Sequence, residues 1–360
     1  ATRERLARRF TERVEHIEAE ARYAALSRLH DNADDQRLLR AALTALAEEI
    51  RAGGAGALGP GHYALGRGYL ALGDEAQARV HLETAWRAGF REPRAAYALA
   101  LVLGRLYQEG LRRAEQLEQG PQRAAKRAEL AARYRAPALD YLRQSHGAPV
   151  PSTEYVAALV ALYEDRHDDA LRHLDAIGAG LPWFYEAPLL RGEVLLARAD
   201  ARRDRGDREG ARGDLEAGRR TLARAAAIGE SVPAVHNALA RLEYVALQTE
   251  LFGPGDVVPA YTRGVAALGR ARAIATEDID ALLLEAAFHR RLAEHQGNQG
   301  QDADALLQRA IATAERARAL APQRAAVLLE VGLSHWQLGQ ARQARNQDPA
   351  SALRAASAAL

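Results

Sequence analysis

Apolar residues recur three and four positions apart along almost the whole chain, which is the spacing of one face of an α-helix. The stretch 59–92 shows this most clearly: a helix, a tight turn at Leu72-Gly73-Asp74, and a second helix ending at Gly89. Residues placed where two such antiparallel helices would touch are Leu65, Gly66, Tyr69, Ala78, Leu82 and Ala85. No run of β-branched residues bounded by turn signals occurs, so the expected fold class is all-α.

Residues 1–57 have helical periodicity of their own. Leu6, Phe10, Val14 and Ile17 predict a helix that stops near residues 30–32. A second helix should begin near Asp34 and end at Gly53-Gly54. Its predicted inner face consists of Leu38, Leu39, Leu43, Leu46 and Ile50. We therefore expect residues 1–57 to form an N-terminal helical hairpin that serves as a cap or linker, and residues 58–360 to form a repeat domain.

Further helix pairs follow along the chain. They are expected to start at Pro93, Pro151, Pro182, Pro233, Asp278 and Gln323. The predicted breaks inside them lie at Gly120-Pro121, Pro137, Glu164–Asp169, Gly206-Asp207, Phe252–Gly255 and Gly297–Gly300. In the last pair, Leu328, Leu329, Leu333 and Trp336 are predicted to point inward, and the chain stops within its second helix. The spacing of the pairs drifts, so the expected repeat is irregular.

The stretch 59–92 also resembles the tetratricopeptide (TPR) consensus W-x2-L-G-x2-Y…A-x3-F…P, whose period is about 34 residues. Leu65, Gly66, Tyr69 and Ala78 match the consensus directly, whereas His62, Leu82 and Pro93 depart from it or lie one position late. The resemblance implies a right-handed α-solenoid of about seven irregular helix pairs that stack to bury a continuous core. It also implies a protein–protein interaction or scaffold role.

Composition and charge narrow the classes of partner. The chain has 49 basic and 47 acidic residues, and Arg alternates with Asp and Glu, as in Asp200–Arg220. Alternation of this kind is typical of a solvated helix face, and no nucleic-acid partner is expected. The chain has no cysteine, which excludes thiolate chemistry. No window is apolar enough to span a membrane, and a cytoplasmic location is expected. Since methionine is also absent, we expect a processed chain or a fragment.

No motif supports catalysis. Gly54–Gly59 formally satisfies G-x-G-x-x-G, but a helix rather than a strand precedes it, which favours a linker. The acidic turn Glu164–Asp169 lies near His167 and His173 and could be mistaken for a metal site. We interpret it as an N-capping turn that complements the dipole of the following helix. The expectation is a protein that is not an enzyme, with no catalytic residue, no metal and no cofactor.

In TPR proteins, the first helix of each pair lines a concave groove through positions 2, 5, 9, 12 and 13. By register, the candidate groove residues are Tyr63, Arg67, Tyr97, Arg105, Tyr155, Leu159, Tyr163, Asn237, Arg241 and Tyr244. Tyr and Arg are the side chains that most often anchor protein ligands. Alternatively, the tyrosines pack between adjacent first helices. Residues 1–57 or a neighbouring domain could also fill the groove.

Three stretches are similar to the region that follows the kinase domain in large bacterial serine/threonine protein kinases. They are Leu6–Asp31, Gly59–Asp74 and Ala96–Glu109. No glycine-rich loop, H-R-D or D-F-G motif is present, so no catalytic residue carries over. The resemblance implies a regulatory or substrate-recruiting region that works with a kinase in cis. An alternative is a ligand-sensing regulatory domain that binds a small molecule or peptide between repeats, for which residues 120–137 could line a pocket.

Overall fold

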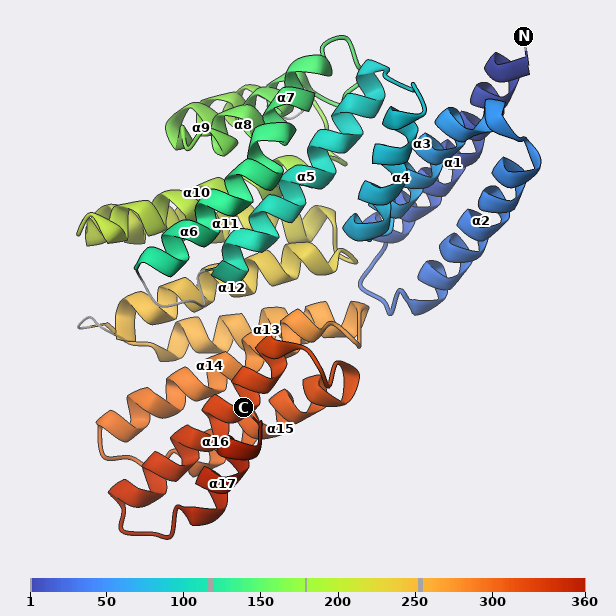
Figure 1. The fold of residues 1–360 in the computed structure, drawn as a ribbon. Helices are drawn as coiled ribbons and strands as arrows, with labels where there is room; N and C mark the ends of the chain where they lie inside the picture. The colour runs from blue at the N-terminus through green and yellow to red at the C-terminus, as the bar shows by residue number, and fades with distance from the viewer. Residues whose placement is uncertain (1, 115–119, 179, 252–254, 360) are drawn as a thin grey trace. The chain divides into compact units, whose positions relative to one another are not determined.

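A computed structural model describes residues 2–114, 120–178, 180–251 and 255–359, and all regular elements within them are helices. Contacts divide the chain into two compact units (Figure 1). Unit 1 comprises Ala1–Leu26 and Asn32–Leu181, and unit 2 comprises Ser27–Asp31 and Pro182–Leu360. The all-α prediction is confirmed. The predicted division into residues 1–57 and 58–360 stays a prediction.

Unit 1 contains helices α1 to α9, with a short 3₁₀ turn and a π segment. Their bounds are α1 Thr2–Leu26, α2 Ala33–Ala52, η1 Ala55–Ala57, α3 Leu58–Ala71, α4 Glu75–Arg87, α5 Pro93–Ala114, α6 Pro121–Leu130, η2 Ala131–Arg135, α7 Ala136–Gln144, α8 Thr153–Tyr163 and α9 His167–Ala176. Since α2 precedes η1 and α3 follows it, Gly54–Gly59 joins two helices, as the linker interpretation requires.

The pair α3–α4 forms where the TPR-like stretch predicts it. Gly73 has a φ of +74°, which a glycine adopts without strain, and it ends the first helix. The Asp74 side chain then accepts a hydrogen bond of 3.0 Å from the backbone N–H of Gln77 and caps α4. Gly66 lies directly against Leu82, where a Cβ would come within 2.4 Å of the leucine. The missing side chain therefore lets the two helices approach closely.

The two N-terminal helices pack on each other and on the first repeat. α1 packs more extensively on α3 than on α2, and its Phe10, Val14 and Ile17 are buried in the same cluster as Leu43. The first helix ends at Leu26, short of the predicted stop near residue 30. The predicted inward position of Leu38 is wrong. Its side chain is 70% exposed because the buried stripe of α2 runs through residues 39, 43, 46 and 50.

In the second pair, the predicted separate helix at Pro137 is also wrong. α6 passes through the π segment Ala131–Arg135 directly into α7. Proline has no N–H and its ring crowds the carbonyl four residues earlier, which disturbs a regular helix. A π turn widens the helix locally and allows it to continue.

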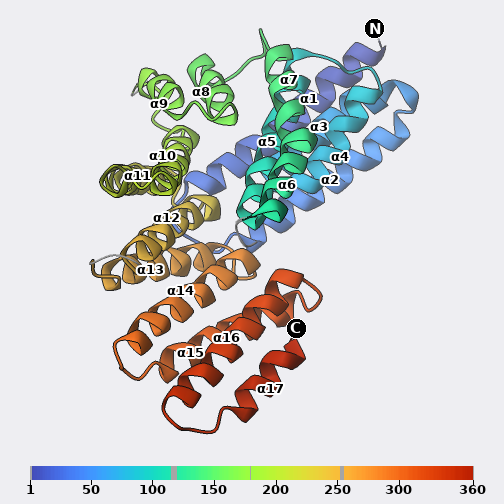
Figure 2. The same cartoon turned by 60° about the vertical axis from the view of Figure 1, so that its left-hand side comes forward.

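Unit 2 contains four antiparallel pairs that follow one another in chain order (Figure 2). Their bounds are α10 Glu186–Asp204, α11 Arg208–Ile228, α12 Pro233–Leu251, α13 Val258–Ile274, α14 Ile279–Asn298, α15 Asp304–Leu320, α16 Ala325–Ala344 and α17 Ala350–Ala359. Three second helices end at Ile228, Ile274 and Leu320, 46 residues apart each time. Within this unit the spacing is constant, so the drift expected along the chain comes from unit 1 and from the change to longer helices in unit 2.

Helix starts and close packing in unit 2 follow the local sequence. The side chains of Asp207 and Asp278 accept hydrogen bonds from the backbone N–H groups of Gly210 and Ala281 and cap α11 and α14. Phe288 is fully buried and fills the space that Gly264 leaves on α13. Of the predicted break Phe252–Gly255, residues 252–254 lie outside the described part.

The inward prediction for two residues of the last pair is wrong. Leu329 is 40% exposed and Trp336 is 49% exposed. The buried face of α16 consists instead of Val327, Val331, Ser334 and Leu338. These side chains meet α14, α15 and α17, which leaves the face with Leu329 and Trp336 uncovered.

Candidate functional site

At the first repeat of unit 1, the predicted groove residues Tyr63 and Arg67 already have partners within the chain. Tyr63 is buried, and its ring lies 5.0 Å from that of Phe90. Arg67 donates a hydrogen bond of 2.7 Å from Nε to Glu18 of α1 and a second one from Nη2. Burial raises the pKa of Glu18, and the charge of Arg67 opposes that shift. Glu18 of the segment 1–57 thus pairs with one of the two predicted groove residues of α3.

Further along unit 1, the predicted groove residues separate into accessible and buried ones. Tyr97 on α5 and Tyr155 on α8 are half-buried. Arg105 is exposed, with Nη1 3.3 Å from Glu75. Leu159 and Tyr163 are buried, and the Tyr163 ring packs over a glycine of α5 at position 104.

In unit 2, the three predicted groove residues lie on α12 and reach neighbouring first helices. Asn237 donates a hydrogen bond of 2.7 Å to Asp278 at the start of α14. Arg241 lies 4.0 Å from Glu193 of α10. The Tyr244 ring meets Phe288 of α14 edge to face at 5.2 Å. All three α12 residues are half-buried. The predicted residues therefore occur in sets within each unit.

Unit 2 contains a series of buried ion pairs that could not be identified from the sequence. The Glu243 carboxylate is fully buried and accepts hydrogen bonds from Arg219 at 2.5 Å and Arg263 at 3.0 Å. Asp214 accepts in the same way from Arg198. The arginine partners lie on other helices, so no local sequence signal distinguishes these buried carboxylates.

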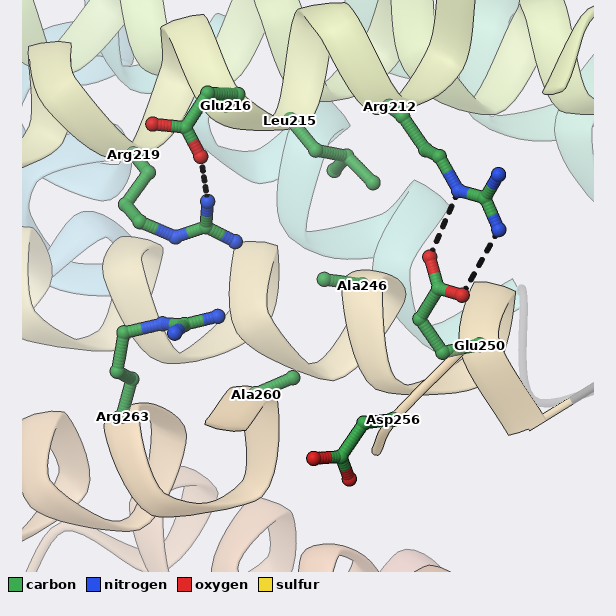
Figure 3. A pocket seen from close by; sticks show the side chains of 9 residues that line it. All are labelled: Arg212, Leu215, Glu216, Arg219, Ala246, Glu250, Asp256, Ala260 and Arg263. Atoms are coloured by element: carbon green, nitrogen blue, oxygen red, sulfur yellow. Dashed lines mark hydrogen bonds and ion pairs between the residues drawn. The ribbon is translucent and has the colours of Figure 1, made fainter. Parts of the chain in front are cut away.

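A cavity of about 340 Å³ is lined by residues of α11, α12 and α13 (Figure 3). Arg219 and Arg263 lie at one end, and Arg212, Glu250 and Asp256 lie at the other. The space between them is lined by Leu215, Ala246 and Ala260. Arg212 is held bidentately by Glu250 at 2.8 and 2.9 Å. Because each of the three arginines has an acidic partner, the cavity is polar but close to neutral.

A second polar cluster joins α13, α14 and α15. Tyr261 Oη lies 2.9 Å from Nδ1 of His289, and Glu285 Oε1 lies 3.9 Å from Nε2 of the same ring. Burial, with the charges of Arg309 and Arg272, lowers the pKa of His289 to about 4. Burial raises the pKa of Glu285, and the positive charge of the nearby Arg272 opposes that shift. The imidazole is therefore neutral at pH 7, and the cluster acts as a structural network between three helices.

The acidic turn has a structural arrangement of its own. Arg166 pairs with Glu164 and Asp169 across the start of α9, and His173 Nδ1 lies 2.7 Å from Glu154. In the part of the chain that the structure describes, no three His, Cys, Asp or Glu side chains converge as a metal site would require. Likewise, no described helix has the length and apolar character needed to cross a membrane.

Comparison with known proteins finds structures with a similar helical fold but assigns the chain to no family. No protein-family model and no curated protein matches the chain. Among experimental structures, it is similar to TTC0263, a TPR protein of Thermus thermophilus, with 19% identity and a TM-score of 0.40 over 63% of this chain and 98% of that one. Yeast Tom70 matches with 13% identity and a TM-score of 0.43 over 92% and 70% of the two chains. Human IFIT1, in a structure with m7Gppp-AAAA, matches with 13% identity and a TM-score of 0.36 over 96% and 94%.

Likeness at this level carries no argument about function. The contacts within the chain define the architecture by themselves. In both units, helices adjacent in sequence form pairs, and successive pairs pack on each other. The protein is all-α and is built from TPR-like helix pairs.

Proposed function

We propose that the protein is a non-catalytic interaction module that binds protein or peptide ligands along the inner face of its first helices. Six of the ten predicted groove residues support this proposal because they keep accessible surface while fixed on rigid helices. They are Tyr97, Arg105 and Tyr155 in unit 1, and Asn237, Arg241 and Tyr244 in unit 2. A preformed helical surface loses little conformational entropy when it binds a ligand.

The observation that carries the proposal is the contrast between the first repeat and the later ones. Arg67 is paired with Glu18 of α1, and this pair suggests a complementary element: a helix with an acidic side chain opposite the arginine. Tyr97 and Arg105 on α5 and Tyr155 on α8 offer the same types of side chain and keep part of their surface exposed. A ligand segment with acidic and apolar side chains would complement them.

We further propose that the module is the regulatory or substrate-recruiting region of a bacterial serine/threonine kinase, and that it acts in the cytoplasm. The support is the sequence resemblance in Leu6–Asp31, Gly59–Asp74 and Ala96–Glu109. A kinase domain in cis would then be one partner.

The cavity between α11 and α13 favours a second candidate function. It lies between consecutive repeats, so a small molecule or peptide bound there would contact both of them. Binding could then shift the spacing of the pairs, as a ligand-sensing regulatory domain requires.

The test is a pull-down from native lysate with the chain as bait, at low and high salt. Tyr155→Ala with Arg241→Ala should abolish capture of a salt-resistant protein while leaving thermal stability nearly unchanged. A matched control removes the same two residue types elsewhere, with Tyr23→Ala and Arg224→Ala. Equal capture by both double variants would refute the groove, and capture that disappears at high salt would point to a polyanion such as nucleic acid.

A further inference from the structure

The hairpin formed by the end of α5 and by α6 departs from the balanced charge of the chain as a whole. Residues 112–135 carry seven basic and three acidic side chains, whereas the full chain has 49 and 47. Two of the three acidic residues fall within 115–119, outside the described part, and the third is Glu129. The basic residues are Arg112, Arg113, Arg123, Lys126, Arg127, Arg133 and Arg135. The segment is therefore strongly basic even when every carboxylate in it is counted.

Packing brings the basic residues of the two helices together. α5 and α6 lie side by side and run in opposite directions (Figure 1). A Cβ on Gly110 would come within 2.5 Å of Leu130, so these two positions face each other. Three residues further along each helix, Arg113 of α5 then lies within about one helical turn of Arg127 of α6. Like charges this close repel each other, which costs stability unless an anion binds beside them.

α6 contributes little to the core of unit 1. The structure describes α6 over its full length, and Leu130 is its only buried side chain. By comparison, α4 and α9 bury three side chains each. Ala124, Ala125 and Ala128 are exposed between the basic residues of α6. Because these side chains are small, a partner's backbone can come close to the arginines.

The cations of the hairpin differ in whether they have an acidic partner. Ion pairs within α5 and α6 engage Arg113 and Lys126. Arg112 and Arg127 are exposed, and neither has a carboxylate partner among the described residues. Their guanidinium groups therefore offer planar pairs of N–H donors that fit a carboxylate.

The extent of the basic surface favours a short ligand. α6 has ten residues and is therefore about 15 Å long. Carboxylates border the surface beyond η2. Burial raises the pKa of Tyr141 on α7, and the negative charges of Glu83 and Asp140 add to that shift. A long polyanion that extends past η2 would meet these carboxylates.

The side chains of the surface favour a polypeptide over a nucleic acid. α6 contains no aromatic residue, whereas single-stranded nucleic acids are bound by stacking their bases on aromatic rings. The nearest ring along the chain, Tyr134, already lies between Arg79 and Arg133, at 5.5 and 5.2 Å. Arginines separated by exposed alanines instead suit an acidic segment that lies along the helix.

We propose that the basic surface defined by Arg112, Arg113, Lys126 and Arg127 docks an acidic segment of a partner protein. Glu or Asp side chains of that segment accept hydrogen bonds from the arginines and remove the repulsion between the two helices. The surface includes none of the six accessible groove residues. The two sites can therefore be tested separately, and either can fail without the other.

The first experiment measures fluorescence anisotropy of a labelled peptide of alternating Glu and Ala with the full chain at low salt. A single-stranded oligonucleotide of equal net charge is the second probe. Arg112→Gln with Arg127→Gln should weaken peptide binding at least about tenfold, because two sets of charge-assisted hydrogen bonds are lost. The matched control is Arg51→Gln with Arg87→Gln, which removes the same charge from exposed arginines of α2 and α4 and should leave the affinity unchanged.

Three results of this experiment would overturn the proposal. They are no binding of the peptide, equal losses in the two double variants, and tighter binding of the oligonucleotide than of the peptide. All variants change exposed side chains, so each should keep the circular dichroism spectrum of the unmodified chain.

A second experiment locates the peptide without any substitution. Hydrogen exchange resolved by peptide should become slower in residues 121–135 when the Glu-Ala peptide is added, and it should stay unchanged in α3 and α8. Slower exchange in α8 and around Tyr97, with none in 121–135, would place the acidic peptide in the groove. That result would contradict the basic surface as its site and would support the groove instead.

Discussion

Glu243→Gln is the substitution that most directly tests the buried polar network of unit 2. The carboxylate is fully buried and is shared by Arg219 and Arg263. The amide keeps the shape but removes the charge, and it places a donor group among guanidinium donors. Removing one partner of a buried pair costs about 3–5 kcal/mol in general. Arg219 keeps Glu216 and the Arg263 side chain is 45% exposed, so we expect about 3 kcal/mol, the lower end of that range.

Hydrogen exchange resolved by peptide is the appropriate assay, because a chain with two units need not unfold in a single step. Protected amides of α12 should exchange roughly 100-fold faster in Glu243→Gln, since about 3 kcal/mol corresponds to that change in the opening equilibrium. Glu250→Gln is the control. Its bidentate pair with Arg212 lies at the surface, where loss of an ion pair costs about 1 kcal/mol or less. Equal effects of the two substitutions would refute the claim that the Glu243 ion pairs contribute more to stability because they are buried.

Three further predictions concern single sites. Gly104→Ala places a Cβ 1.8 Å from the Tyr163 hydroxyl oxygen and should lower the free energy of unfolding by about 1–3 kcal/mol; a chemical denaturation midpoint equal to that of the unmodified chain would show that the ring moves away freely. Gly213→Ala has open space around its Cβ on α11 and should raise the free energy of unfolding by up to about 1 kcal/mol in the same measurement. His289 has a pKa of about 4 when folded and 6.5 as its ordinary value, so the unfolded chain binds more protons between these pH values. The stability that neutral His289 contributes is complete above pH 6.5 and falls as the pH drops toward 4, by about 3 kcal/mol in total. Denaturation from pH 7 to 4 should therefore show a smaller acid loss in His289→Gln than in the unmodified chain, and identical pH profiles would contradict a buried neutral ring.

Most helices could be predicted from the sequence, because helical periodicity and caps are local properties. The break at Gly73-Asp74 combines a residue that tolerates positive φ with a capping aspartate, and both signals are visible in the sequence. The failures at Leu38 and Trp336 have another origin. Whether an apolar residue is buried depends on which helix packs against it, and that contact comes from a distant part of the chain.

The candidate groove could be predicted in part. The repeat register predicted that Tyr97, Arg105 and Tyr155 lie on first helices, and the structure leaves all three at least partly exposed there. It could not predict that Glu18 would pair with Arg67, since these residues lie 49 positions apart. The burial of Glu243 was equally hidden, because its partners Arg219 and Arg263 lie on other helices, 24 and 20 positions away.

The constant period of unit 2 has a consequence for the order in which its repeats assemble. Helix pairs with nearly equal spacing present similar backbones to one another, and repeat proteins are prone to docking with the wrong neighbour. The polar partners differ from one junction to another. Arg219 of α11 pairs with Glu243 of α12, whereas Arg290 of α14 pairs with Glu330 of α16. A pair that docks one place out of order leaves a buried charge without its partner, which is far less favourable than a misplaced apolar contact. The ion pairs therefore favour docking of each repeat on its own neighbour.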